Sequence, residues 1–319
     1  MTPKVPPRST ASRVGIGLPV YNGERFLEAA IEAILAQTYE DFELVVVDNA
    51  STDRSVEIAR DIASNDGRIR IELNETNLGA PRNFNRAFDI THGEYFKWAA
   101  HDDLLEPTYL ERCISFLDAE RDYVLCHSRV GVIGSEGKPL YDYDVNLPHV
   151  ESSAPADRFG DLVLIRHACY DAFGVLRRST LARTPRIGAY LSSDRCLLAE
   201  LALHGRFRIL PETLYLNREH GDRSVRIPNH QRARAWFDQG RGGRFIFPAW
   251  RLLGEYAAAI DRTPLSQADR RACRRVLVRW LLRNWRLLRG DLRIAAIDAL
   301  RSRPSASASA KLDGSEGHK

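Results

Sequence analysis

One stretch decides the fold class of this chain: Phe42-Glu43-Leu44-Val45-Val46-Val47-Asp48-Asn49. Its continuous apolar run predicts a strand buried on both faces, as strands are in a parallel sheet, and the run ends on a carboxylate and an amide. Strands and helices alternate on both sides of it: strands are expected over 14–20, 68–73 and 95–100, and helices from Glu24, over 53–63 and from Pro81. This order predicts an α/β fold with a mostly parallel central sheet flanked by helices.

Polar residues follow three of the expected strands. The first strand runs into Tyr21 and Asn22, the second into Asp48 and Asn49, and the fourth into His101, Asp102 and Asp103. In an open α/β sheet, ligands bind at the carboxyl ends of the strands, so these residues are the first candidates for a site. Gly15 and Gly17 lie inside the first strand and no third glycine opens a helix, which excludes a nicotinamide fingerprint and a P-loop.

The adjacent carboxylates Asp102 and Asp103 offer another way to hold a diphosphate. Hard cations such as Mg²⁺ or Mn²⁺ are often bound by one or two carboxylates together with substrate phosphates. The alternative is that the two acids cap the helix that Pro107 opens.

Four sequence blocks follow one another along the chain: Leu18-Pro19-Val20-Tyr21-Asn22, Val46-Val47-Asp48-Asn49-Ala50-Ser51-Thr52-Asp53, Asn77-Leu78-Gly79-Ala80-Pro81-Arg82-Asn83, and His101-Asp102-Asp103 with Pro107 four positions later. Together and in this order they resemble the family 2 glycosyltransferases. The resemblance covers about residues 13–225 and implies the nucleotide-sugar-binding GT-A fold with a C-terminal helical extension.

The resemblance implies roles for several residues at a nucleotide-sugar site. Asp48 would accept a hydrogen bond from the base, while Pro19, Tyr21 and Asn22 would line the same site. Arg82 falls where the family places a residue near the base and phosphates, and a cation there suits a diphosphate. The alternative for Arg82 is a solvated helix charge.

The family's metal motif is usually Asp, any residue, Asp, and here Ala100 occupies the first position. This departure leaves Asp102 as the expected ligand for Mn²⁺ or Mg²⁺, with Asp103 either behind that ligand or in contact with the sugar. The segment 218–224 resembles the part of the family that adds a late histidine. We therefore expect His220 to contact the metal or phosphate, with an ordinary surface histidine as the alternative.

Sugar transfer to a hydroxyl also needs a base. Ser192-Ser193-Asp194-Arg195 resembles the family segment whose acid opens a helix beside the acceptor, so Asp194 is the expected catalytic base, and a helix-capping Asp is the alternative. The implied activity is that of an inverting, hexosyltransferase-like enzyme that uses a nucleoside-diphosphate sugar. Its acceptor would be a glycan, a lipid-linked compound or a small molecule with a hydroxyl.

Charge divides the chain near residue 223. Residues 1–222 contain 25 Lys or Arg and 34 Asp or Glu, whereas residues 223–303 contain 19 Arg and 6 acids. We predict a flexible N-terminus over 1–12, a glycosyltransferase domain over 13–225, a basic helical region over 226–303 and a disordered tail over 304–319.

The basic region contains an amphipathic helix over 270–289. Four arginines recur at helical spacing, and four apolar residues form a separate stripe on another side of the helix. The arginines are Arg275, Arg279, Arg283 and Arg286, and the apolar residues are Leu277, Leu281, Trp285 and Leu288. One interpretation is that the apolar stripe packs on the body of the same chain or on a second subunit; packing on a second subunit would give a homo-oligomer. The other is peripheral contact with an anionic membrane. No recognised motif supports nucleic-acid binding.

Five scattered cysteines and the lack of a long apolar run favour a cytoplasmic protein, with peripheral attachment at the inner membrane face as a variant of that expectation. Two other functions stay open on sequence grounds. Ala100 is compatible with a nucleotide-sugar-binding protein without turnover, and the basic helices are compatible with a membrane or nucleic-acid interaction module.

Overall fold

A computed structural model describes residues 12–221 and 247–301, with side chains described as far as Ile294. The expected disordered tail over 304–319 lies outside these residues, as does nearly all of the expected flexible N-terminus over 1–12. The expected domain boundary near residue 225 also falls outside them.

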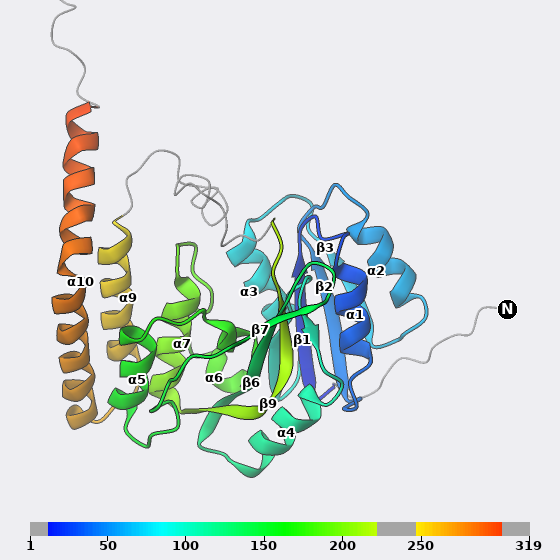
Figure 1. Cartoon of the computed structure of the whole chain (residues 1–319), viewed down its shortest axis with the longest axis horizontal. Helices are drawn as coiled ribbons and strands as arrows, with labels where there is room; N and C mark the ends of the chain where they lie inside the picture. Colours follow the sequence, from blue (N-terminus) through cyan, green and yellow to red (C-terminus); the bar gives the residue numbers. More distant parts are fainter. Residues whose placement is uncertain (1–11, 222–246, 302–319) are drawn as a thin grey trace, which may run out of the picture.

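The sheet has nine strands within the described residues, in the order β3-β2-β1-β4-β8-β6-β9-β5, and β7 pairs with β6 (Figure 1). Strands β3, β2, β1 and β4 are mutually parallel, as the apolar run in β2 predicted. The strands are β1 (Val14–Val20), β2 (Phe42–Asp48), β3 (Ile69–Leu73), β4 (Tyr95–Trp98), β5 (Leu104–Leu105), β6 (Tyr123–Ile133), β7 (Pro139–Tyr143), β8 (Val175–Arg177) and β9 (Arg206–Arg218).

Helices cover both faces of this sheet. They are α1 (Leu27–Leu35), α2 (Ser55–Ala63), α3 (Ala80–Ile90), α4 (Tyr109–Ala119), α5 (Pro155–Leu164), α6 (Arg178–Leu181), α7 (Ser193–His204), α9 (Pro248–Arg262) and α10 (Gln267–Arg301), with a 3-10 turn, η1 (Tyr170–Phe173). Alternation along β2 divides the core, because successive side chains of a strand point to opposite faces. Leu44 and Val46 join a cluster with α1 and α4, whereas Val45 and Val47 join one with α3, α5, α7, α9 and α10.

The glycines of β1 serve helix packing. A Cβ at Gly17 would lie 2.8 Å from the Cβ of Ala87, so only glycine lets α3 approach the strand this closely. This contact gives Gly17 a structural role in the sheet that needs no phosphate loop.

Three elements differ from the sequence expectation. Helix α1 begins at Leu27 instead of Glu24. The polar, proline-containing segment 141–155 predicts a loop, but β7 extends into its first residues. Strand β9 continues through Pro211, where two strands were expected. The pairing of β9 with β6 shifts register between Leu210 and Thr213, and such an irregularity tolerates a proline that has no N–H to donate.

The C-terminal helices pack on the body through an aromatic series. Phe159 of α5 contacts Tyr256 of α9, and Tyr256 contacts Trp280 of α10, with ring centroids 6.1 and 5.7 Å apart. Glu200 of α7, whose side chain is almost fully buried, pairs with Arg262 of α9 at 2.6 Å. These contacts place α9 and α10 against α5 and α7, at the opposite end of the molecule from α1 and α2 (Figure 1).

Candidate functional site

The loops after β1, β2 and β4 meet at one edge of the sheet. Val20 is in register with Asp48, and the N–H of Ala99 donates to the carbonyl of Gly17 at 2.9 Å. The loop that follows β1 turns through Gly23, whose N–H donates to Ser55 Oγ at 2.8 Å. A Cβ at Gly23 would lie 2.6 Å from a ring carbon of His101, so the first loop packs directly on the third.

Asp48 has one carboxylate oxygen committed and one left over. The carboxylate is buried; Oδ2 accepts from the N–H of Ser51 at 3.0 Å, and Oδ1 is buried with no hydrogen-bond partner in the described part of the chain. A buried oxygen without a donor costs free energy, which a ligand donor would recover. The environment of Asp48 therefore suits an N–H group of a base.

Buried amides fix this corner of the sheet. Asn49 Oδ1 accepts from the N–H of Leu78 at 2.9 Å and from Asn74 Nδ2 at 3.0 Å, while its own amide donates to Asn77 Oδ1 at 2.9 Å. Asn83 accepts from Asn74 at 2.8 Å and donates to the carbonyl of Val47 at 2.9 Å. This amide clamp, formed by Asn49, Asn74, Asn77 and Asn83, ties the ends of β2 and β3 to the first turn of α3.

The other expected nucleotide contacts occupy different environments. Pro19 is buried in β1, opposite Val47, and Tyr21 is half-buried just after it. Asn22 is exposed, but its Oδ1 already accepts from the N–H of Thr52 at 2.9 Å, so this side chain joins the first two loops. Arg82 projects from the first turn of α3, exposed and without an ion pair in the described residues.

Asp102 and His220 meet, although 118 positions separate them in the chain. His220 Nε2 lies 2.9 Å from Asp102 Oδ2, and the two side chains are 5% and 17% exposed. The histidine ring packs on Phe26 with centroids 4.8 Å apart, and its Nδ1 is buried with no partner among the described residues.

Asp103 is engaged by β9 through every oxygen. Asn217 Nδ2 and the N–H of Arg218 donate to Oδ1 at 2.9 and 2.8 Å, and the Tyr215 hydroxyl donates to Oδ2. Burial, and after it the charge of Asp102, raise the pKa of Asp103 to about 7. Of the two roles expected for Asp103, this geometry favours the one behind Asp102, since no oxygen is left for a sugar.

Lys97 lies beneath this cluster and is fully buried. Its ammonium donates to the carbonyl of Phe173 and faces the rings of Tyr109 and Tyr215 at 4.7 and 5.2 Å from their centroids. Burial lowers the pKa of Lys97 to about 7.

A divalent cation fits the Asp102–His220 pair. Adjacent ligands of one octahedral Mg²⁺, at about 2.1 Å each, lie roughly 3 Å apart, and the two side-chain atoms are 2.9 Å apart. No group of three or more His, Cys, Asp or Glu able to hold a metal occurs within 12–221 or 247–294. The pair therefore suits a cation that takes its remaining ligands from a diphosphate and water.

Asp194 stands in the first turn of α7. Its Oδ1 accepts from the N–H of Arg195 at 2.8 Å, and burial raises the pKa of the carboxyl above its ordinary value. The guanidinium of Arg195 donates to the carbonyls of Leu162, Ile165 and His167 at 3.1, 3.1 and 2.8 Å. Arg195 thus fixes the start of α7, the helix whose first turn carries Asp194.

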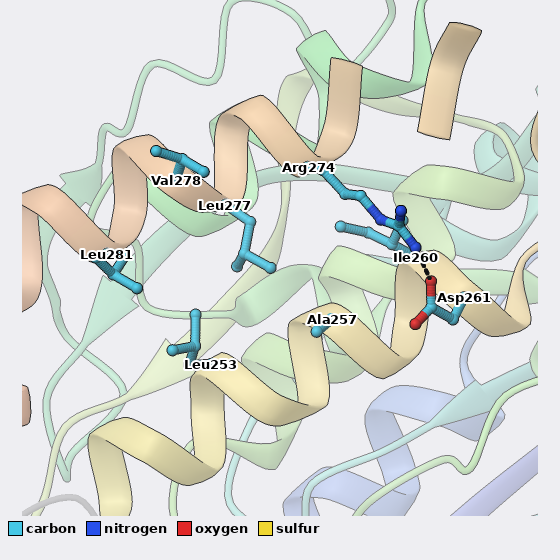
Figure 2. Close-up of a pocket in the computed structure, with 8 residues that line it drawn as sticks. All are labelled: Leu253, Ala257, Ile260, Asp261, Arg274, Leu277, Val278 and Leu281. Atoms are coloured by element: carbon cyan, nitrogen blue, oxygen red, sulfur yellow. Dashed lines mark hydrogen bonds and ion pairs between the residues drawn. The ribbon is translucent and has the colours of Figure 1, made fainter. Parts of the chain in front are cut away.

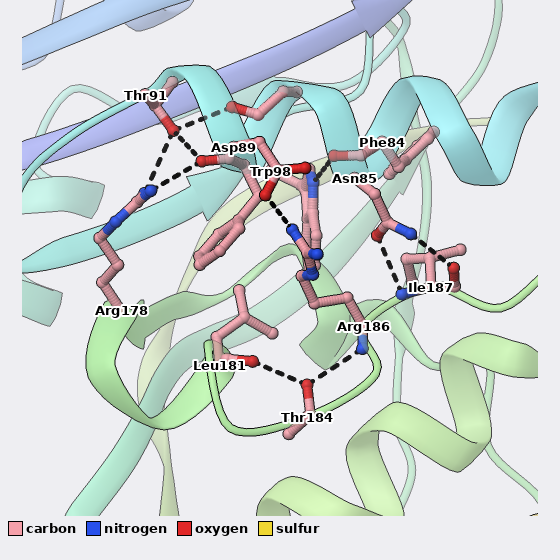
Figure 3. A network of polar contacts seen from close by, with 12 residues as sticks. Phe84, Asn85, Asp89, Thr91, Trp98, Arg178, Leu181, Thr184, Arg186 and Ile187 are labelled. Atoms are coloured by element: carbon pink, nitrogen blue, oxygen red, sulfur yellow. Dashed lines mark hydrogen bonds and ion pairs between the residues drawn. The ribbon is translucent and has the colours of Figure 1, made fainter. Parts of the chain in front are cut away.

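Figure 3 shows how the segment before Asp194 is held on α3. Asn85 donates to the carbonyl of Ile187 at 2.8 Å and accepts from its N–H at 3.1 Å, and Arg186 pairs with Asp89. The same α3 carries Arg82 and Asn83 at its other end. The helix therefore connects the segment leading to Asp194 with the amide clamp beside Asp48.

A second connection joins Asp194 to the acidic cluster. Burial raises the pKa of the Cys169 thiol, and Asp194 lies close enough for its carboxylate to raise this pKa further. The neighbouring Tyr170 donates to Asn217 Oδ1 at 3.0 Å. Asn217 in turn donates to Asp103. Asp194 and Asp102 are thus linked through adjacent residues of η1 and β9.

Comparisons with known proteins bear on the family and on the fold. The family model described as "Glycosyl transferase family 2" matches residues 16–181. The chain belongs to glycosyl transferase family 2. By family it is a transferase, with the GT-A fold that the resemblance implied.

Named relatives and a solved structure give the same family or fold. An uncharacterised glycosyltransferase of Haemophilus influenzae is 24% identical over 230 residues, 68% of this chain and 69% of that protein. The putative glycosyltransferase EpsE of Bacillus subtilis is 34% identical over 36% of this chain and 42% of its own length. S. aureus TarS, solved with UDP, has a TM-score of 0.59 at 17% identity, covering 86% of this chain and 72% of the TarS chain, and this likeness concerns the fold.

Sequence reasoning missed the residues that hold the glycosyltransferase site in shape. Tyr215, Asn217 and Arg218 fix Asp103 from β9, and Arg218 Nε also donates to the carbonyl of Asp102 at 2.9 Å. The polar residues Asn217 and Arg218, which follow the apolar run Leu214 to Leu216 just before His220, were an available signal. The amide clamp had a signal too, since Asn49, Asn77 and Asn83 lie inside the blocks that carry the family resemblance.

Proposed function

We propose that this glycosyltransferase transfers a sugar, with inversion, from a nucleoside-diphosphate sugar to a hydroxyl acceptor. The observation that carries the proposal is the Asp102–His220 pair at 2.9 Å, at the edge of the sheet where Asp48 keeps an unpartnered oxygen. One feature suits a diphosphate and its cation, and the other suits a base. Such groups stand together where a nucleotide and its phosphates are bound at once.

The base is proposed to be of the uridine or thymidine type. Both bases carry an imide N–H that can donate to the free oxygen of Asp48. TarS, whose fold this chain shares at 17% identity, has been solved with UDP and with UDP-GlcNAc. Arg82, exposed on the first turn of α3, would contact the phosphates when the donor binds.

The proposed cation is Mn²⁺ or Mg²⁺, held by Asp102 and His220. When bound, it would stabilise the negative charge of the departing diphosphate. Arg218 donates to the carbonyl of Asp102 and to the carboxylate of Asp103, so the backbone that carries the proposed ligand is already held in place when the donor arrives.

Asp194 is proposed as the base for a single displacement. The acceptor oxygen forms a bond to the anomeric carbon, the bond from that carbon to the diphosphate oxygen breaks, and the acceptor proton passes to Asp194. Burial raises the pKa of Asp194, which makes the carboxylate a stronger base once it is ionised. Arg195 fixes the start of α7, and Cys169 lies close to the carboxylate.

A thermal-shift screen joined to a nucleotide-release assay tests the proposal. Nucleoside diphosphates and nucleotide sugars, with and without Mn²⁺, should raise the melting temperature, because ligands that bind only the folded state stabilise it. Asp102→Ala should abolish the Mn²⁺-dependent part of the shift, and Asp194→Asn should keep the shift and lower transfer about 10²–10⁴-fold. Asp122→Asn, an exposed carboxylate in the turn before β6, is the matched control.

The pH profile separates the base from a helix cap. The base must be ionised, so kcat/KM should fall as pH drops through the raised pKa of Asp194, and Asp194→Asn should lose this limb of the profile. Normal transfer by Asp194→Asn would remove the base assignment. Donor binding without release of any nucleoside diphosphate in the unsubstituted protein would instead favour a binding protein without turnover, which Ala100 in the metal motif makes the second candidate.

A further inference from the structure

Helix α10 has an inner face that is fully used. Cys273, Val276, Trp280 and Leu288 are buried in the cluster that α10 shares with α5, α7 and α9. This face attaches the helix to the body. Leu277, Arg270 and Arg274 add further contacts with the core cluster and with the end of α9.

A second face of α10 is apolar and exposed. Leu282 is 65% exposed and Trp285 is 44% exposed, and three further apolar side chains share their sector of the helix. At 100° per residue these positions fall within a stripe about 100° wide. We call it the outer stripe: Val278, Leu281, Leu282, Trp285 and Leu292.

The outer stripe borders a groove between α9 and α10. Figure 2 shows Leu277 and Leu281 on the side of α10 that faces Leu253 of α9, while Val278 lies at the outer rim of the groove. The groove has a volume of about 370 Å³, and the pair Arg274–Asp261, 3.0 Å apart, closes one end. The exposed apolar surface therefore spreads from α10 onto α9.

Arginines line the side of the stripe that faces away from the body. They have no ion pair within the described residues. The guanidinium carbons of two of them, Arg286 and Arg289, lie 5.7 and 5.2 Å from the ring centroid of Trp285. This arginine row consists of Arg275, Arg279, Arg283, Arg286, Arg289 and Arg293. Over its length α10 carries ten Arg and three Asp.

We propose that the outer stripe and the arginine row dock the protein peripherally on an anionic lipid surface. An indole beside arginines and leucines suits the boundary between headgroups and acyl chains, where the apolar part is buried and the cations meet phosphates. Within the described ranges, every helix is too short or too polar to cross a bilayer, so the contact is one that lies on the surface.

The positive charge of the arginine row argues against a second copy of the chain as the partner that covers the outer stripe. An isologous contact through the outer stripe would bring two arginine rows together, with repulsion that only added anions would relieve. An anionic bilayer supplies those anions itself. Each Arg near such a surface strengthens binding by roughly fivefold, so several together give a substantial affinity.

Vesicle co-sedimentation of the full chain tests the proposal. Vesicles of phosphatidylcholine with 30 mol% phosphatidylglycerol are compared with vesicles of phosphatidylcholine alone. The assay is run at a salt concentration close to physiological, at which the charge of the vesicle surface is only partly screened. Binding should require the anionic lipid. Arg279→Gln/Arg283→Gln/Arg286→Gln should weaken it about 100-fold, since three such contacts are lost. Leu282→Ser/Trp285→Ser should weaken it at least tenfold, because the inserted apolar surface is lost.

Control variants remove the same kinds of side chain from the body instead of from α10. Arg60→Gln/Arg121→Gln/Arg129→Gln takes three exposed arginines from the body, and Leu140→Ser/Tyr141→Ser takes exposed apolar side chains from β7. Both should bind vesicles as the unsubstituted protein does. Equal loss in these controls would overturn the assignment to α10.

Three further results would also overturn it. One is equal binding to both vesicle types. Another is a dimer in light scattering that Leu282→Ser/Trp285→Ser converts to a monomer, which would assign the stripe to a second copy. The third is binding to a 30-base-pair DNA duplex that competes with vesicles and depends on the arginine row but not on Leu282 or Trp285.

Discussion

The edge of the sheet and the outer face of α10 treat their side chains in opposite ways. At the edge, Asp103 accepts from three donors and the members of the amide clamp bond to one another, so that buried polar atoms without a partner remain only at Asp48, Asn74 and His220 among the residues described there. On α10, by contrast, Leu282 and Trp285 lie exposed beside arginines that have no ion pairs in the described chain.

The difference separates a preorganised site from an adhesive surface. A site for chemistry needs side chains held in one geometry before the ligand arrives, and hydrogen bonds from behind provide this. A surface that adheres to lipid needs only the correct composition on one face of a helix. Substitutions at the edge should therefore act through precise geometry, and those on the outer stripe should act only when a membrane is present.

The largest effect on stability is expected from the inner face of α10. Trp280 is 5% exposed and contacts Tyr256, so Trp280→Ala should lower the free energy of unfolding by about 3–5 kcal/mol through lost burial and the cavity left behind. Urea denaturation followed by far-UV circular dichroism measures the change. A loss below about 1 kcal/mol would mean that α10 is not anchored in the core in solution.

Local pattern predicted this region only in part. Spacing over 270–289 placed Leu277, Leu281, Trp285 and Leu288 on one stripe, but Leu288 is buried and Trp285 is exposed. Helical periodicity tells which side chains share a face, whereas the neighbours that cover each face come from α5, α7 and α9, far away in the sequence. The parallel strands were easier to predict, since an apolar run such as Val45 to Val47 carries its own signal.

An intermediate effect, dependent on pH, is expected at Asp103. Its folded-state pKa of about 7 lies above that of the unfolded chain, so the proton is bound more tightly in the folded state. Stability from this group is complete below about pH 4 and is lost as pH rises toward 7, where the unfolded carboxyl ionises first. Lys97, whose pKa is lowered to about 7, is charged in both states below about pH 6 and therefore adds slope only at the upper end of this window.

Asp103→Asn should remove this slope. The amide retains an oxygen for Asn217 and for the N–H of Arg218, and its nitrogen can donate to Tyr215, so the contacts are largely kept. Between pH 4 and 7, the unsubstituted protein should lose on the order of 2–3 kcal/mol more than the variant does in urea denaturation. Asp122→Asn should follow the unsubstituted protein, and parallel curves for Asp103→Asn would show that Asp103 ionises as easily folded as unfolded.

The site illustrates what sequence can and cannot indicate. Asp48 and Asp102 were predicted because family blocks contain them, and Asp194 and His220 because the short segments around them resemble the family; all of these signals are local. The partners of Asp103 were not, because Tyr215 and Arg218 lie 112 and 115 positions away and reach it only through the pairing of β5 with β9. Long-range hydrogen bonds leave no period in the sequence, so residues that orient the acids are harder to find than the acids themselves.

The smallest effect on stability is expected from the outer stripe. Trp285→Ala should change the free energy of unfolding by less than about 0.5 kcal/mol in the absence of lipid, since the indole is 44% exposed and contacts mainly the guanidinium groups of Arg286 and Arg289. Urea denaturation of Trp285→Ala and Trp280→Ala measures the free energy of unfolding for both variants, and so compares two tryptophans that lie five positions apart on one helix. Similar losses for both would mean that Trp285 is covered in solution, and the contrast between an anchored inner face and an adhesive outer face would then fail.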